Sequence, residues 1–330
     1  MNSAKTEAAL QMEKRKTETA DEVDLSVEIA GIKLQNPIMP ASGCFGYGQE
    51  FAQIEGFDPS RLGAMVSKGT TLMSWPGNPQ PRICEHQGGM INWIGLENPG
   101  IDEVIAKKIP FMMQFGVPVI INISGFTIEQ FAHMAILLDA VKAVAGIEIN
   151  ISCPNVEGGR IPFGCDPIIA AEVVKAVREV TALPLIVKLT PNVPDEKIGE
   201  IAIAVEKAGA NAISMINTIK VVNVGGIAAG GLSGRPIKAA ALRMIKIVRQ
   251  AVKIPIIGMG GIYTVEDVVE FLRIGCSAVA VGTANFSNPL IMMELIDGLR
   301  KYFEENGIAD FSEFYKVEIS KIMERSVEWK

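Results

Sequence analysis

The chain has 330 residues, of which 48% are hydrophobic and 21% are charged, and its net charge is −6. This is the composition of a globular protein with a large core, and the acidic balance without a basic patch argues against nucleic acid as a partner. No run of about 18 apolar residues occurs, so the sequence predicts no membrane span.

The N-terminal segment is polar and charged, and it has no apolar stretch of the kind found in signal peptides. We therefore expect a loosely ordered tail over residues 1–24, followed by one domain over residues 25–330. A single domain suits this length because α/β barrels routinely occupy it.

The cysteines and histidines limit the kinds of metal site and catalytic mechanism that the sequence allows. The five cysteines are an odd number without a CxxC pair, which favours a reducing cytoplasm over a disulfide scaffold. Their spacing matches no zinc or iron–sulfur site, and only two histidines are present. No metal site is expected, and Ser-His or multi-histidine mechanisms have almost no residues to work with.

In chain order, short β-branched runs alternate with helical patterns, which is typical of parallel βαβ construction. Capping signals mark helix ends: Asp166-Pro167 opens one helix, and Thr264 with Asp267 three residues later opens another, which Gly275 ends. The core strands are expected at Ile38–Ala41, Ala64–Ser67, Val119–Asn122, Ile147–Asn150, Leu185–Leu189, Ala212–Ile216, Ile256–Gly258 and Ala278–Val281.

Eight strand–helix units predict a TIM (β/α)8 barrel. A doubly wound open sheet is the alternative, since a strand count alone does not show closure. Residues 70–118, rich in proline, glycine and tryptophan, are too long for a simple βα connection. We expect them to form an insertion, a loop region over the C-terminal face of the barrel, where such insertions usually serve binding.

Polar and glycine residues gather at the C-terminal end of every expected strand. In a barrel this end is the catalytic face. Loops are commonly polar, but that does not explain lysines and asparagines directly at strand exits. The residues are Ala41-Ser42-Gly43, Lys68-Gly69-Thr70, Asn122, Asn150 to Asn155, Lys188, Asn217-Thr218, Gly258 to Gly261 and Gly282-Thr283.

Glycine-rich loops close the last two strands, in IIGMGGI (256–262) and VAVGTANF (279–286). Glycines let backbone N–H groups approach an anion, and barrels frequently bind phosphate at these loops. Gly230-Gly231 could join them. Because no GxGxxG fingerprint is present, we expect a phosphate-bearing cofactor rather than direct NAD binding.

Lys68 and Lys188 stand at the ends of two expected strands. A lysine there could pair with a phosphate, stabilise an anionic ring or form a Schiff base. Structural ion pairing is the alternative for either residue, because such networks also bury charges.

Cys153 follows a buried strand in EINISCPN (148–155), and Pro154 ends that strand because it has no N–H for the ladder. The thiol would stand between the amides of Asn150 and Asn155, which could grip a planar ligand with amide edges. It could act as a nucleophile or as a proton acceptor. The alternative is a small buried hydrophobe, as most free cysteines are.

Together these motifs resemble class 1 dihydroorotate dehydrogenases, and specifically the class 1B catalytic subunit. The similarity runs from about Leu25 to the C-terminal helices. Its best markers are NPIMPASGCFGYGQE (36–50), SKGTTL (67–72), INWIGLENPG (91–100), NISCPNVEGG (150–159), VKLTPNV (187–193), MINT (215–218), GGLSG (230–234), IIGMGGI and VGTANF.

The resemblance implies a barrel that binds FMN and oxidises dihydroorotate to orotate in pyrimidine biosynthesis. It implies that Cys153 is the base that takes a proton from C5 while hydride passes from C6 to the flavin. The residues implied to bind the substrate are Lys68, Asn92, Gly95, Leu96, Asn150, Asn155, Asn217 and Thr218. Those implied to bind FMN are Ala41, Ser42, Lys68, Asn122, Asn150, Lys188, Gly231, Gly260, Gly261, Gly282 and Thr283.

The resemblance also implies partners. Class 1B enzymes work with a second subunit that carries FAD and an iron–sulfur cluster and passes electrons to NAD. We therefore expect a homodimer that associates with such a subunit. The chain's own lack of cluster cysteines and of a Rossmann motif agrees with this division of labour.

Three departures from the family pattern bear on the substrate. The segment 219–229 before GGLSG is short, Trp93 stands where a small residue is expected, and Glu97 stands where glutamine is more usual. They leave open a paralogous FMN oxidoreductase that acts on another dihydropyrimidine or related cyclic substrate. A non-catalytic FMN electron-relay module and a Schiff-base aldolase using Lys188 are further alternatives, and the intact Cys153 argues against both.

Overall fold

The computed structural model describes residues 23–152, 163–224 and 227–327. All eight expected core strands are present, and they form one parallel sheet in the order β3-β14-β13-β10-β9-β8-β7-β4. Their bounds are β3 Ile38–Pro40, β4 Met65–Val66, β7 Val119–Ile123, β8 Val144–Asn150, β9 Leu185–Lys188, β10 Ala212–Met215, β13 Ile256–Met259 and β14 Ala278–Val281.

The sheet curls into a nearly closed barrel, because its two terminal strands, β3 and β4, lie side by side. The N–H of Gly63 donates to the carbonyl of Ile38 at 2.8 Å. A Cβ at position 63 would lie only 2.2 Å from the Asn36 carbonyl, so glycine permits this approach. The predicted TIM barrel is confirmed, and the open-sheet alternative is wrong.

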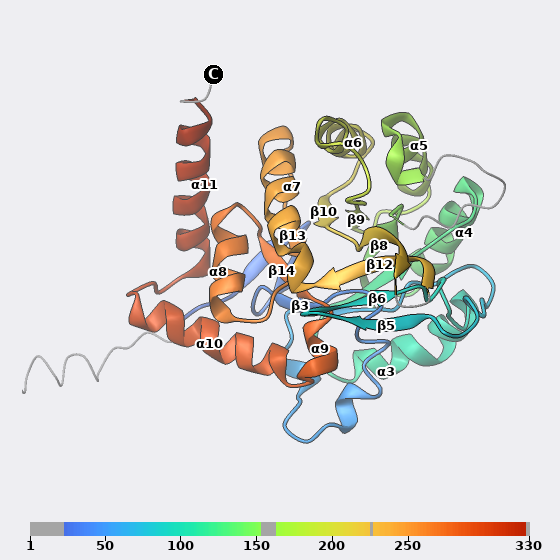
Figure 1. Cartoon of the computed structure of the whole chain (residues 1–330), viewed down its shortest axis with the longest axis horizontal. Helices are drawn as coiled ribbons and strands as arrows, with labels where there is room; N and C mark the ends of the chain where they lie inside the picture. Colours follow the sequence, from blue (N-terminus) through green and yellow to red (C-terminus); the bar gives the residue numbers. More distant parts are fainter. Residues whose placement is uncertain (1–22, 153–162, 225–226, 328–330) are drawn as a thin grey trace, which may run out of the picture.

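The helices surround the barrel, as Figure 1 shows for α3 to α8 and α10. The signals at Asp166 and Thr264 are confirmed, since both side chains accept N-terminal N–H groups of their helices. No helix within the described residues is both long and apolar enough to cross a membrane. The bounds are α2 Ile101–Glu103, the π-helical turn η3 Val104–Lys108, α3 Ile109–Met113, α4 Ile128–Asp139, α5 Pro167–Arg178, α6 Asp195–Lys207, α7 Lys238–Ala251, α8 Val265–Arg273, α9 Ala284–Ser287, α10 Ile291–Glu305 and α11 Phe311–Val327, with short 3-10 turns at Phe51–Gln53, Pro59–Arg61, Phe163–Cys165 and Arg235–Ile237.

The barrel interior has an apolar lower part and a polar upper part. A hairpin of β1 (Val27–Ile29) and β2 (Ile32–Leu34) packs into the apolar part together with inward residues of the barrel strands. Each such fully buried Ile or Leu contributes about 1.5–3 kcal/mol. Toward the carboxyl ends of the strands the buried inward residues become polar, and they are Asn122, Glu148, Asn150, Lys188 and Ser214.

The insertion over the barrel mouth is a sheet rather than the expected loop region. Strands β5 (Ile83–His86) and β6 (Gly89–Asn92) pair with a second hairpin, β11 (Ile219–Val224) and β12 (Ile227–Gly234), in the antiparallel order β11-β12-β6-β5. The remainder of 70–118 includes the barrel helices α2 and α3. Sequence patterning could not find β5, because it is largely exposed and lacks alternation of apolar and polar residues.

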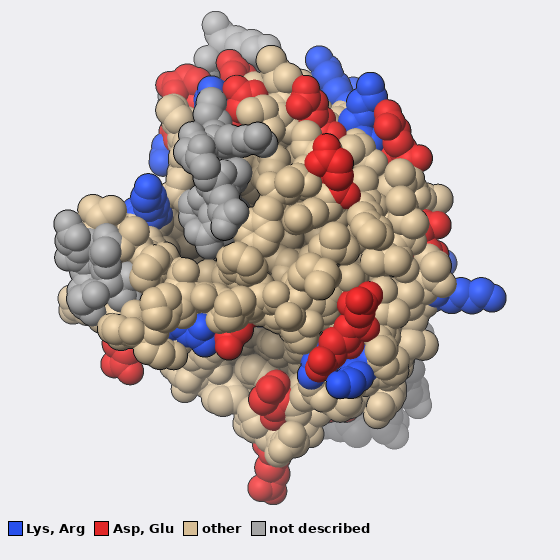
Figure 2. Space-filling view, turned by 90° about the vertical axis from the view of Figure 1, so that its right-hand side faces the viewer, with Lys and Arg blue, Asp and Glu red and all other residues tan. Residues whose placement is uncertain are grey.

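Charges on the outer surface are mixed. On the face drawn in Figure 2, acidic and basic side chains are interspersed along the margins of a largely uncharged centre. That face therefore offers no continuous surface of one sign.

Asp267, in the first turn of α8, bonds to the loop that precedes this helix and to α7. Its carboxylate accepts from the N–H groups of Tyr263 (2.8 Å) and Thr264 (2.9 Å) and pairs with Lys238 at the start of α7. Burial by itself would raise the pKa of Asp267, but Lys238 and the two N–H groups outweigh it and lower the pKa. A lowered folded-state pKa adds stability above the unfolded-state pKa, and this is lost as the pH falls through the folded value.

We expect Asp267→Asn to lower the free energy of unfolding at pH 7 by about 2 kcal/mol, because hydrogen bonds to a charged group are lost. The difference from wild type should begin to shrink below about pH 4, because the carboxyl of the unfolded chain takes up a proton there before the folded one does. Urea denaturation at pH 7 and at pH 3.5 measures the free energy of unfolding of the two proteins at each pH. Glu172→Gln, an exposed change on α5, is the control and should have little effect. An equal loss at both pH values would contradict this account.

Candidate active site

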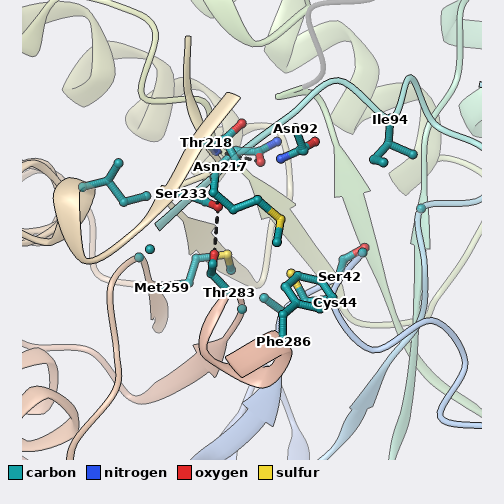
Figure 3. Close-up of a pocket in the computed structure, with 18 of the residues that line it drawn as sticks. Ser42, Cys44, Asn92, Ile94, Asn217, Thr218, Ser233, Met259, Thr283 and Phe286 are labelled. Carbon is teal, nitrogen blue, oxygen red and sulfur yellow. Dashed lines mark hydrogen bonds between the residues drawn. The ribbon is translucent and has the colours of Figure 1, made fainter. Parts of the chain in front are cut away.

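A cavity of about 540 Å³ opens at the carboxyl ends of the barrel strands, beneath the four-stranded sheet. Its volume lies within the range of about 300–1,000 Å³ that is usual for small-molecule sites. Figure 3 shows polar side chains from separate segments facing this space, among them Ser42, Asn92, Asn217, Thr218, Ser233 and Thr283. The barrel and the insertion therefore build the site jointly.

Most of the described residues that the sequence predicted for the site line this cavity. Asn122 and Gly231 do not, and Cys153 and Asn155 lie outside the described residues. Those that line it are Ala41, Ser42, Lys68, Asn92, Gly95, Leu96, Asn150, Lys188, Asn217, Thr218, Gly260, Gly261, Gly282 and Thr283.

Gly231 and Asn122 stand back from the cavity for different reasons. A Cβ at Gly231 would lie 2.0 Å from Thr218 Oγ1, so glycine there lets β12 pass close to the exit of β10. The contact of Gly231 with the cofactor stays a prediction. Asn122 is fully buried behind Gly69, yet its Oδ1 has no hydrogen-bond partner in the described part of the chain.

The glycine loops form the expected cradle. Gly260 and Gly261 have φ values of 123° and 80°, which favour glycine. A Cβ at Gly261 would lie 2.7 Å from Lys238 Cβ. Across from them, the Thr283 hydroxyl donates to Ser233 Oγ at 2.8 Å. Backbone N–H groups and hydroxyls around an open space are suited to a phosphate.

Ser233 was not among the predicted site residues. It stands in the GGLSG motif, but its place at the cavity depends on the pairing of β12 with β6, where it is opposite Met90. No local signal in the sequence shows that pairing.

Lys188 is the most unusual charged group of the cavity. Its residue is only 4% exposed, and no hydrogen bond or ion pair joins its ammonium to another described residue. Burying an ammonium without a partner costs much free energy. A buried cation that faces an open cavity indicates an electron-rich or anionic ligand.

Cys44 lies close to the two cavity lysines. Burial raises the pKa of the Cys44 thiol, and the charges of Lys188 and Lys68 oppose that rise in part. The raised pKa disfavours the thiolate, so this cysteine is poorly suited to act as a base.

The asparagines of the cavity are oriented by a hydroxyl. Ser152 donates to Asn150 Oδ1 at 2.5 Å, and Ser152 Oγ accepts from Asn217 Nδ2 at 2.6 Å. Asn150 Nδ2 also donates to Ser124 Oγ at 3.0 Å. Because an amide nitrogen carries two hydrogens, both asparagines keep one N–H donor for a ligand carbonyl or carboxylate.

The loop after β6 turns its backbone toward the cavity. Gly95 and Leu96 have φ values of 72° and 63°, and left-handed geometry costs a non-glycine residue about 1–2 kcal/mol. Asn98 Nδ2 holds the loop by donating to the Leu96 carbonyl at 2.7 Å. This arrangement agrees with the expectation that Gly95 and Leu96 offer backbone contacts.

Glu97 is the one acidic residue among the described residues that line the cavity. It forms an ion pair with Arg82, which also lines the cavity and donates to the Asn78 carbonyl at 3.2 Å. Since Arg82 neutralises it, Glu97 adds no net negative charge to a cavity that otherwise holds lysines.

Trp93 does not line the cavity, although its neighbours Asn92 and Ile94 do. Successive side chains of an extended segment point to opposite sides, and the Trp93 N–H pairs with the Arg82 carbonyl at 2.7 Å. The Trp93 ring therefore lies outside the cavity. The short segment 219–229 lies within the β11–β12 hairpin, and β12 lines the cavity through Ser233 and Gly234.

A family model described as dihydroorotate dehydrogenase matches residues 24–303. The chain is 51% identical over 298 residues to a protein of Geotalea uraniireducens, covering 88% of this chain and 96% of that one. It is 48% identical over 297 residues to a protein of Geobacillus kaustophilus, covering 88% and 94%. Both are named dihydroorotate dehydrogenase B (NAD(+)), catalytic subunit. The chain therefore belongs to the dihydroorotate dehydrogenase family.

Proposed function

We propose that this chain is the catalytic subunit of an NAD-linked dihydroorotate dehydrogenase, which oxidises dihydroorotate to orotate in pyrimidine biosynthesis. The relatives carry that activity in their names, and the similarity covers most of both chains. The observation that supports it best in the structure is the buried Lys188, which has no hydrogen-bond or ion-pair partner among the described residues and faces a cavity at the barrel mouth. Family membership sets aside the aldolase alternative.

The flavin of this proposal is FMN, and the cavity residues fit it. The loops at Gly260, Gly261 and Thr283 suit a terminal phosphate, and Lys188 suits an electron-rich ring system. When bound, FMN supplies the acceptor for the hydride that leaves C6 of the substrate. The glycine cradle explains why a phosphorylated flavin would be preferred over riboflavin.

The chain's own side chains bind and orient the substrate in this proposal. Lys68 and the remaining N–H donors of Asn150 and Asn217 would hold its carboxylate and ring carbonyls. Asn92, Thr218 and the backbone of Gly95 and Leu96 line the same space.

Cys153 would remove the proton from C5. It and Asn155 lie outside the described residues, so both roles rest on the sequence motif.

The two electrons that the hydride carries to the flavin would leave through a partner. The relatives' names specify a catalytic subunit and NAD(+), which supports a second subunit. We propose that this subunit carries FAD and an iron–sulfur cluster. We propose that the chain forms a homodimer that associates with that subunit in the cytoplasm. The free thiols of Cys44, Cys84, Cys165 and Cys276 are consistent with a reducing compartment.

Anaerobic mixing of the FMN-loaded protein with dihydroorotate tests the reaction. We expect rapid bleaching of the yellow flavin band. Dihydrouracil, a dihydropyrimidine without the carboxylate, should bleach it far more slowly because it offers Lys68 no carboxylate to pair with. Bleaching by dihydrouracil but not by dihydroorotate would overturn the substrate. A protein that cannot take up FMN would overturn the flavin assignment.

A further inference from the structure

Glu148 is a buried carboxylate that the reaction proposed above does not use. It lies in β8 with its side chain in the barrel interior, is 4% exposed, and is not among the residues that line the cavity. In register it stands between Asn122 of β7 and Ile186 of β9. Because a buried carboxylate is costly unless its oxygens are satisfied, its partners reveal what it does.

Two neutral side chains satisfy Glu148. Its Oε1 accepts from the Ser214 hydroxyl at 2.6 Å, and its Oε2 accepts from Asn122 Nδ2 at 2.5 Å. No lysine or arginine of the described residues forms an ion pair with it. Glu148 therefore links β7, β8 and β10 through hydrogen bonds and does not serve as a counter-ion.

The carboxylate dictates which way the Asn122 amide is turned. A carboxylate only accepts hydrogen bonds, so Asn122 must present its NH₂ group to Glu148. Its Oδ1 is then at the other end of the amide, where it is buried and has no partner among the described residues. A Cβ at Gly69 would lie 3.1 Å from this oxygen, and Gly69 lines the cavity. Glycine thus leaves a route from the cavity to an acceptor that lacks a donor.

We infer that Glu148 is a positioning residue that, through Asn122, presents a carbonyl acceptor to a ring N–H of the bound ligand. The inference rests on the proposed function. An imide N–H occurs both in the flavin ring and in the dihydropyrimidine ring, so the acceptor could serve either. The experiment separates the two sources.

Glu148→Gln reverses the donor pattern without changing the size of the side chain. If Ser214 keeps its bond to the Gln oxygen, the Gln NH₂ group faces Asn122 and turns the Asn122 oxygen away from the ligand. The Asn122 NH₂ group then faces the N–H of the ligand, so two hydrogen-bond donors meet. Adding Asn122→Asp restores the pattern, because one oxygen of that side chain accepts from the Gln NH₂ and the other faces the ligand.

The experiment has two readouts. The first is the affinity of the apoprotein for FMN and for N3-methyl-FMN, measured by quenching of flavin fluorescence. The second is the KM for dihydroorotate. If the flavin supplies the N–H, Glu148→Gln should weaken FMN binding about 10-fold, which is about 1.4 kcal/mol, and leave N3-methyl-FMN unchanged. If the substrate supplies the N–H, the affinity for FMN should stay unchanged while the KM for dihydroorotate rises about 10-fold. In both cases the double variant should return to within about 3-fold of wild type.

Ser214→Ala is the matched control. It removes the other bond of Glu148 but keeps a carboxylate opposite Asn122, so it should lower the unfolding temperature without changing the preference for FMN over N3-methyl-FMN. The inference is overturned if Glu148→Gln alters neither affinity nor KM, or if the folded double variant shows no recovery. A wild-type protein that binds neither flavin would instead refute the proposed function, and this inference with it.

Discussion

Lys188→Met should give a folded protein that binds FMN about 100-fold more weakly than wild type. Bonds from a charged donor to a ligand contribute about 1.5–3 kcal/mol, and 100-fold corresponds to about 2.7 kcal/mol. The apoprotein should be no less stable than wild type, because methionine replaces a buried ammonium that has no partner among the described residues. Flavin titration and thermal unfolding of the apoprotein measure the two effects.

Lys246→Met is the matched control for that change. Lys246 is exposed on α7, outside the barrel, so the same loss of charge should leave FMN affinity unaltered. If Lys188→Met binds FMN as tightly as wild type, Lys188 does not contact the cofactor. If its apoprotein is markedly destabilised, the ammonium has a structural role instead.

Cys153→Ser should slow reduction of the flavin by dihydroorotate about 10³-fold, within the range of about 10²–10⁴ that general bases contribute. A serine hydroxyl is a much poorer base than a thiol, whose ordinary pKa is about 8.5. The rate of bleaching in wild type should rise with pH as the thiol ionises and then level off. Anaerobic stopped-flow measurements between pH 6 and 10 give both rates.

Cys84→Ser provides the comparison for this prediction. Cys84 lies in β5 and does not line the cavity, and its thiol donates to the neighbouring Glu85 carbonyl at 3.3 Å, so its loss should leave the reduction rate unchanged. A Cys153→Ser protein that reduces its flavin at the wild-type rate would show that another group takes the C5 proton.

The barrel strands were predictable because each is a short apolar run that local patterning reveals. Seven or eight residues around Ile147 or Val119 are enough to indicate a buried strand, and a polar residue at its exit is visible in the same window. The same holds for the capping signals at Asp166 and Thr264, which act within three residues. The same local signal places Ser42, Lys68 and Lys188 at strand exits, where all three line the cavity, and their binding roles stay predictions.

The predictions about the barrel mouth were less successful because its geometry depends on distant pairing. Strand β6 meets β12 with Asn92 opposite Gly231, residues far apart in sequence, and β5 has no apolar face to mark it. This pairing turns Trp93 outward, brings Ser233 to the cavity and makes Gly231 a packing residue.

The sequence alone determined the fold class, the residue types at the strand exits and, through its motifs, the family. These depend on local chemistry: apolar runs, helix caps, glycines and a cysteine beside a proline. The tertiary structure alone decided which exits converge, that Lys188 is buried with no partner in the described part of the chain, and that Glu148 accepts a hydrogen bond from Asn122. Such facts depend on burial and on hydrogen bonds between strands that no single segment contains.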